Sequence, residues 1–150
     1  MPPLVAMLRA KIDSGVVEML RGVPIFSGMT DRQLKTLGKD AQERTFPEGA
    51  TVVRQGEKGI GFYLVLDGKV DVRRGGRRLA SLGPGEFFGE MALFDEIART
   101  ADVVATTPAR CLVLSKWEFW GFAMDEPKVL RGMMEVMARR LGATEKALSE

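Results

Sequence analysis

The sequence contains no histidine and a single cysteine, and these absences narrow the chemistry available to the chain. Without histidine there is no imidazole general base, no imidazole metal ligand and no histidine-based nucleophilic triad. The one thiol, Cys111, lies in a strand-like apolar run, which indicates a buried small hydrophobic residue rather than a reactive group. Catalysis would depend on carboxylates alone, so we expect a protein that is not an enzyme and that binds no metal.

A strong net charge and a long apolar run are also missing. The 150 residues carry 22 basic and 20 acidic side chains, a formal net charge of +2, and 45% of them are hydrophobic. This balance argues against disorder and against a strongly basic nucleic-acid surface. No secretory signal or membrane segment is recognisable, and the low cysteine content suits a reducing compartment, so we expect a cytoplasmic protein. The length fits a single domain over residues 1–150.

The spacing of apolar residues predicts helices at both ends of the chain and strands between them. Residues 1–42 show a helical spacing from Leu4 to Leu20 and then, behind a cap at Thr30 or Asp31, a second short helix. From 43 to 115, short alternating runs are separated by glycine-containing turns. The expected fold class is therefore α+β: an antiparallel β jelly-roll barrel of about eight strands flanked by N-terminal and C-terminal helices.

The last third of the chain, residues 116–150, is predicted to be helical. Ser115 is a suitable cap for its first helix, and Pro127 suits the first turn of the second. The second helix repeats its apolar residues at alternating spacings of four and three, at Leu130, Met134, Met137, Leu141, Thr144 and Leu148. This is a heptad seam, and packing on its own barrel or on a twin explains it equally well.

The most informative stretch runs from residue 89 to residue 101. It begins where a two-aromatic strand ends, so a helical turn is expected to start immediately after Gly89. The first amides of a helix have no partner inside it, and those of Ala92 and Leu93 are expected to be free to face an anion. Glycine at this position would let the main chain approach a ligand closely.

Two charged side chains in the same stretch suit a ribose phosphate. Arg99 carries a planar guanidinium that can donate two parallel hydrogen bonds to a phosphodiester. Glu90 would repel a phosphate unless its carboxylate faced a hydroxyl donor, which a ribose supplies. Outside this context, we would interpret Arg99 as a solvated surface arginine and Glu90 as an acid at a helix start.

The run Phe88-Gly89-Glu90-Met91-Ala92-Leu93, followed by Arg99-Thr100-Ala101, resembles the phosphate-binding cassette of the cyclic nucleotide-binding domain family. This family includes the ligand-binding domains of the catabolite activator protein and of protein kinase A regulatory subunits. The segments 23–29, 46–49, 54–57 and 63–70 also resemble the family's entry helix and first strands. The resemblance covers roughly Leu20 to Leu141, and the matching order of its segments argues against chance agreement.

The resemblance implies a ligand site within the cassette, residues 88–101, made by Gly89, Glu90, Met91, Ala92, Arg99, Thr100 and Ala101. Arg99 would bind the cyclic phosphate, Glu90 would accept from the ribose 2'-hydroxyl, and the main chain of Gly89, Ala92 and Thr100 would complete the polar contacts. The ligand is expected to be cAMP rather than cGMP, because cAMP is the more frequent ligand of the family and Thr100 is compatible with both. Asp95 and Glu96 stand where many members carry glycine or proline, and we expect both to point into water.

The resemblance also implies a sensor whose C-terminal helices move when the nucleotide binds. These helices would cover the base, with Leu130, Met133, Met134 and Met137 as candidates, and would offer a surface to a protein partner or a twin. The alternative is an interaction or scaffold module that keeps the fold with weak or no nucleotide affinity. Direct DNA binding is not expected, since no helix-turn-helix follows the last helix. The basic hairpin at 69–78 lacks interleaved aromatics, so its charges suit the solvent side of a strand pair.

Overall fold

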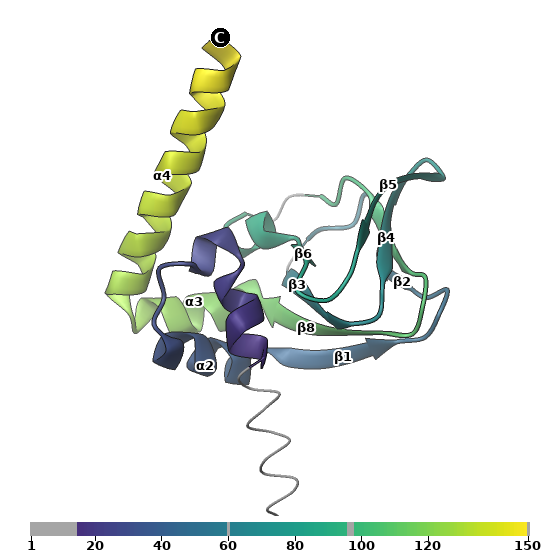
Figure 1. The fold of residues 1–150 in the computed structure, drawn as a ribbon, viewed down its shortest axis with the longest axis horizontal. Helices are drawn as coiled ribbons and strands as arrows, with labels where there is room; N and C mark the ends of the chain where they lie inside the picture. The colour runs from purple at the N-terminus through teal and green to yellow at the C-terminus, as the bar shows by residue number, and fades with distance from the viewer. Residues whose placement is uncertain (1–14, 60, 96–97, 150) are drawn as a thin grey trace, which may run out of the picture.

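A computed structural model describes residues 15–59, 61–95 and 98–149 and contains eight antiparallel strands in two four-stranded sheets, with helices before and after them (Figure 1). The α+β jelly roll predicted from the sequence is therefore confirmed. The strands are β1 (Gln42–Phe46), β2 (Thr51–Val53), β3 (Gly61–Asp67), β4 (Val70–Arg74), β5 (Arg77–Leu82), β6 (Phe87–Phe88), β7 (Asp102–Ala105) and β8 (Ala109–Ser115). The helical elements are η1 (Pro24–Phe26), α2 (Asp31–Asp40), η2 (Glu90–Leu93), α3 (Lys116–Met124) and α4 (Pro127–Ser149).

The two sheets have the strand orders β1-β8-β3-β6 and β2-β7-β4-β5, and they face each other across the barrel. Strand β3 separates two cores, because successive side chains of a strand point to opposite faces. Phe62 and Leu64 pack against the helices, whereas Tyr63 and Val65 face the barrel interior. The nearly continuous apolar run of β3 follows from this burial on both faces.

Cys111 belongs to the barrel interior and is fully buried. Burial raises the pKa of its thiol from an ordinary value of 9.0 to about 11, so the group stays protonated at neutral pH. The interpretation of Cys111 as an inert, buried residue is therefore confirmed.

The helices begin at polar caps. Thr30 accepts a hydrogen bond from the Gln33 N–H (3.2 Å), and its own N–H donates to the Gln33 side chain (2.9 Å), which confirms the predicted start of α2. Ser115 and Glu118 form the same capping box at α3. Residues 15–21 are helical, and the rest of the helix predicted from residue 4 lies outside the described residues.

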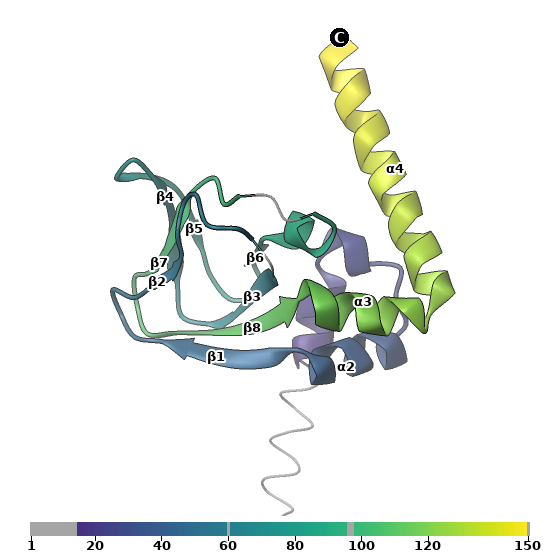
Figure 2. The same cartoon turned by 180° about the vertical axis from the view of Figure 1, so that it is seen from behind.

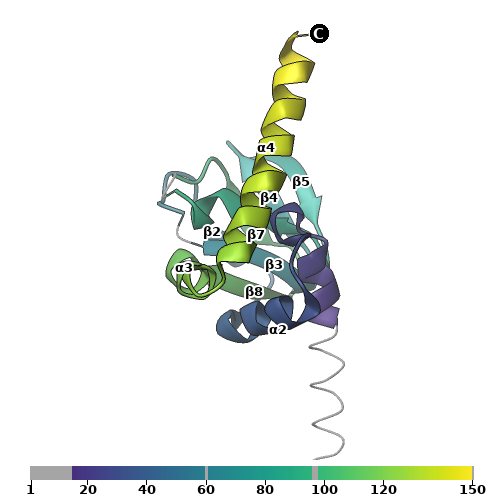
Figure 3. The same cartoon turned by 90° about the vertical axis from the view of Figure 1, so that its left-hand side faces the viewer.

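Helix α4 packs on the core with its first half and stands clear of the barrel with its second half (Figures 1, 2 and 3). Val129, Met133 and Val136 are its buried residues. Three members of the predicted seam are instead among the most exposed large apolar residues, at 71% for Met134, 61% for Leu141 and 84% for Leu148. Packing on the chain's own barrel therefore does not explain this part of the pattern.

Within the described part of the chain, no helix combines the length and apolar character needed to cross a membrane.

Candidate functional site

The residues predicted to bind a ligand surround one cavity of about 410 Å³. The two ends of the cassette, residues 88–92 and 98–101, form one part of its wall, and three valines of the second sheet form the other: Val53, Val72 and Val103. The cavity therefore has a polar, main-chain-rich side and an apolar side. This combination suits a flat ring joined to a charged group.

The guanidinium of Arg99 is half-buried in the wall of this cavity. Its Nη2 donates a hydrogen bond to the Gly61 carbonyl (2.7 Å), and its central carbon lies 5.8 Å from the centre of the Tyr63 ring. Burial lowers the pKa of Arg99 from its ordinary value, because desolvation disfavours the charged form. Among the described residues, no carboxylate lies within ion-pair distance of Arg99. The side chain is thus a partly desolvated cation without an acidic partner in the part of the chain that the structure describes.

The main chain of Arg99 is held on both sides by the turn between β2 and β3. Its N–H donates to the Glu57 carbonyl, and its carbonyl accepts from the Gly56 N–H, both at 2.8 Å. The Asp102 carboxylate accepts from the Gln55 N–H at 2.7 Å and ties the following residues to the same turn. These bonds fix the direction in which the Arg99 side chain leaves the backbone.

Gly89 approaches Arg99 so closely that no side chain fits there. Its φ of 82° lies in the left-handed region, and a Cβ on this residue would overlap Arg99 Nη1 and lie 2.8 Å from the Gly61 oxygen. The sequence requirement for glycine therefore has two causes. The chain must turn from β6 into η2, and the guanidinium must pass beside the turn.

The prediction of a free Ala92 amide is wrong. The turn after Gly89 is a 3₁₀ helix of four residues, and the Ala92 N–H already donates to the Gly89 carbonyl at 3.1 Å. The amides that precede the first bond of this turn belong to Glu90 and Met91, so the available donors lie earlier than expected.

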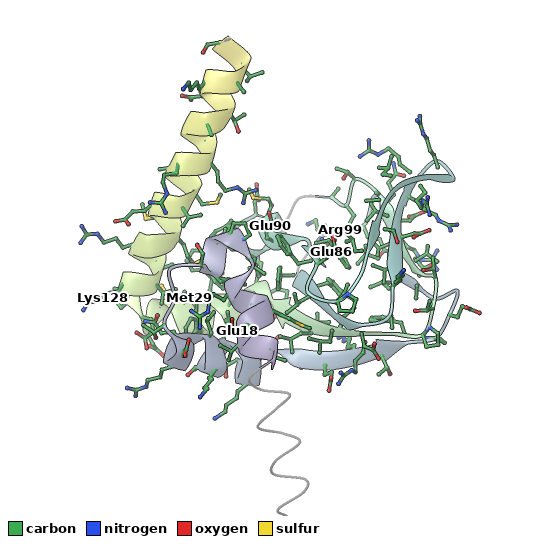
Figure 4. All side chains as sticks on the ribbon, viewed as in Figure 1. Glu18, Met29, Glu86, Glu90, Arg99 and Lys128 are labelled. Carbon is green, nitrogen blue, oxygen red and sulfur yellow. The ribbon has the colours of Figure 1, made fainter. Side chains whose placement is uncertain are left out.

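Glu90 joins the cassette to the C-terminal helix. Its side chain is 17% exposed, and its Oε1 lies 3.5 Å from Arg140 Nη1 on α4. Figure 4 shows Glu90 on the α4 side of the cassette, whereas Arg99 lies on the barrel side. The sequence analysis missed Arg140, because it lies outside the apolar seam and carries no local motif.

The other end of η2 is joined to α3. Trp120 Nε1 donates to the Leu93 carbonyl at 2.7 Å, and the next residue, Phe94, makes edge-to-face contacts with Phe119 and Trp120 at 5.8 and 6.3 Å between ring centres. The cassette therefore contacts both C-terminal helices, one through an indole and one through an ion pair.

The candidate lid residues do not line the cavity in the structure. Met133 is buried in the core, Leu130 and Met137 pack against that core, and Met134 is exposed. Covering a bound base with these residues would require α4 to move.

Asp95 is exposed, as predicted, and Glu96 lies outside the described residues.

Comparison with known proteins shows the family of the chain. The cyclic nucleotide-binding domain family matches residues 43–126. The chain is 37% identical over 127 residues to the cyclic AMP receptor protein of Thermus thermophilus, a match covering 81% of the chain and 59% of that protein. It is 32% identical over 138 residues to the CRP-like cAMP-activated global transcriptional regulator of Mycobacterium tuberculosis, covering 89% of the chain and 62% of that protein.

A solved structure gives the same result. The N-terminal domain of a transcriptional regulator from Streptomyces coelicolor A3(2) matches with a TM-score of 0.82 and 34% identity, over 87% of this chain and 94% of that one. The fold and site define a ligand-binding jelly-roll domain of a regulatory class. The chain belongs to the cyclic nucleotide-binding domain family, and it spans about three fifths of the length of the two curated relatives.

The two glycines at 89 and 85 allow the Arg99 contact to be tested by matched substitutions. Both have positive φ, 82° and 86°, but a Cβ at Gly85 meets nothing within 4 Å. Gly85→Ala is expected to cost about 1–2 kcal/mol from backbone strain alone, whereas Gly89→Ala should cost about 1–3 kcal/mol more because Arg99 must move. Denaturant unfolding measures both. Equal losses in the two variants would show that the approach to Arg99 imposes no constraint.

Proposed function

We propose that the chain is a non-enzymatic sensor that binds a cyclic nucleotide in this cavity and signals to a protein partner through α4. The observation that carries the proposal is the half-buried Arg99 guanidinium, which has no carboxylate beside it among the described residues. Partial desolvation of a charge costs free energy unless a counter-charge is supplied. A cyclic phosphate supplies it, and the guanidinium has enough donors to bind two phosphate oxygens while Nη2 keeps its bond to Gly61.

The ribose would bind beside Glu90, whose carboxylate accepts from the 2'-hydroxyl. A carboxylate this close to a phosphate is unfavourable unless its charge is offset, and Arg140 provides that offset at 3.5 Å. The remaining wall would be made by Gly89, Met91, Ala92, Thr100 and Ala101, with the early amides of η2 directed at the phosphate. The roles of Arg99 and Glu90 are those implied by the family resemblance, whereas the main-chain donors lie earlier than Ala92, whose N–H is bonded to the Gly89 carbonyl.

The base would pack against the apolar side of the cavity. Val53, Val72 and Val103 offer a surface that excludes water from a flat ring. We propose cAMP as the preferred ligand and cGMP as the weaker one. Two observations on relatives support this: one is described as a cyclic AMP receptor protein, and the other as cAMP-activated.

The contacts of η2 supply a route from ligand to partner. A ribose hydroxyl bound at Glu90 would share the carboxylate with Arg140, and a shift of η2 would change the position of the Leu93 carbonyl that Trp120 of α3 contacts. The nucleotide would thereby favour one arrangement of the C-terminal helices over another, which is a population shift between two states. The exposed Met134, Leu141 and Leu148 recur every seven residues and form the surface that we propose contacts a twin.

Replacement of Arg99 tests the nucleotide site. Charge-assisted hydrogen bonds contribute roughly 1.5–3 kcal/mol each, so Arg99→Ala should weaken cAMP binding by about a hundredfold or more. Calorimetric titration with cAMP and cGMP measures the effect, and Arg32→Ala, at an exposed position on α2, is the matched control that should bind as the wild type does. Equally weak binding by wild type and Arg99→Ala would contradict the sensor and favour the scaffold alternative.

A lysine in the exposed seam tests the partner surface. Leu141→Lys should raise the dissociation constant of a homodimer by about tenfold or more, because it places a charge in an apolar contact. Ala143→Lys is the matched control, since two residues at about 100° each place it on a different side of the helix from the seam. Analytical ultracentrifugation, with and without cAMP, measures the association. A wild-type chain that stays monomeric over the whole concentration range would exclude a twin as the partner.

A further inference from the structure

We propose that Arg74, at the end of β4, is a positioning residue of the nucleotide site, which holds the main chain of Thr100 and adds a second positive charge behind the cavity wall. The inference rests on the proposed function. From the sequence, Arg74 belongs to a basic hairpin whose side chains suit the solvent side of a strand pair. The structure gives this arginine a contact that its neighbours in the hairpin do not make.

The contact is a hydrogen bond across 26 residues. Arg74 Nε donates to the Thr100 carbonyl at 2.9 Å, and Thr100 directly follows Arg99. Thr100 lines the cavity, whereas Arg74 does not, so Arg74 reaches the site through the main chain of Thr100. A bond from a charged donor to a carbonyl is stronger than a neutral one, and it fixes the orientation of the peptide that follows Thr100.

The same contact improves the electrostatics of an anion site. A main-chain carbonyl carries partial negative charge, which is unfavourable near a phosphate. The guanidinium of Arg74 offsets that charge and leaves a net positive contribution beside Arg99. Because Arg74 is exposed, this contribution is screened by salt, and its effect on affinity should fall as ionic strength rises.

The rest of the hairpin supports the choice of Arg74. Arg73 is paired with the buried Asp71 at 3.2 Å, so its charge is largely neutralised. Arg77 lies directly opposite Arg74 on β5, and like charges in cross-strand positions destabilise a sheet. Arg77 is exposed and carries the same charge in the same hairpin, but the bond to the Thr100 carbonyl comes from Arg74, so Arg77 provides a matched control.

The test compares cAMP affinity in three variants by calorimetry at low and high salt. Arg74→Met keeps the aliphatic stem and should weaken binding by about fivefold to twentyfold at low salt, with a smaller loss at high salt. Arg74→Lys restores the charge without the Nε donor and should recover part of that loss. Arg77→Met should bind within about twofold of wild type, and all three should unfold at similar denaturant concentrations, since exposed substitutions change stability little.

The outcomes separate this inference from the proposed function. Wild-type chain that fails to bind cAMP overturns the proposed function and this inference with it. Wild-type binding that depends on Arg99, combined with equal affinities for Arg74→Met and Arg77→Met, overturns this inference alone. A loss in Arg74→Met that is matched by lower stability, unchanged by salt and not recovered by Arg74→Lys would assign Arg74 a purely structural role and also overturn it.

Discussion

The bond from Arg99 Nη2 to the Gly61 carbonyl holds a positive charge in the wall of the barrel cavity, and the surrounding structure is arranged to keep it there. The turn after β2 holds the Arg99 main chain by two hydrogen bonds, so the backbone position from which the side chain extends is fixed. Gly89 lacks the Cβ that would occupy the same space. A guanidinium that is prepositioned and partly desolvated binds an anion with little further ordering, which is the physical basis of the proposed nucleotide site.

The cassette is also the point at which the barrel meets the C-terminal helices. Four residues of 3₁₀ helix lie between the cavity and two contacts of different kinds: the Glu90–Arg140 ion pair to α4 and the Trp120 bond to the Leu93 carbonyl. The segment that lines the cavity is therefore in direct contact with both α3 and α4. The second half of α4 has few contacts with the barrel and an exposed apolar seam, so moving it costs little packing free energy. This division between a fixed pocket and a weakly held helix suits a regulatory domain.

Much of this could be predicted from the sequence, because the relevant signals are local. Alternating apolar residues and turn glycines predicted the jelly roll, and the caps at Thr30 and Ser115 predicted helix starts. The cassette residues line one cavity, and this could be expected because they are close in sequence. The error at Ala92 is local, because its amide closes a 3₁₀ turn instead of facing outward. The omissions concern tertiary geometry, since the partners of Arg74 and Arg140 lie far away along the chain. A heptad pattern likewise could not tell a barrel-facing helix from a free one.

The most direct measurement is a crystal structure of the chain grown with cAMP. The account predicts the nucleotide in the cavity, with two Arg99 nitrogens at about 2.7–2.9 Å from two exocyclic phosphate oxygens and Gly61 still accepting from Nη2. The 2'-hydroxyl should donate to Glu90. A nucleotide bound elsewhere, or one in the cavity whose phosphate faces solvent while Arg99 contacts only Gly61, would contradict the claim that this guanidinium is the counter-charge of the ligand.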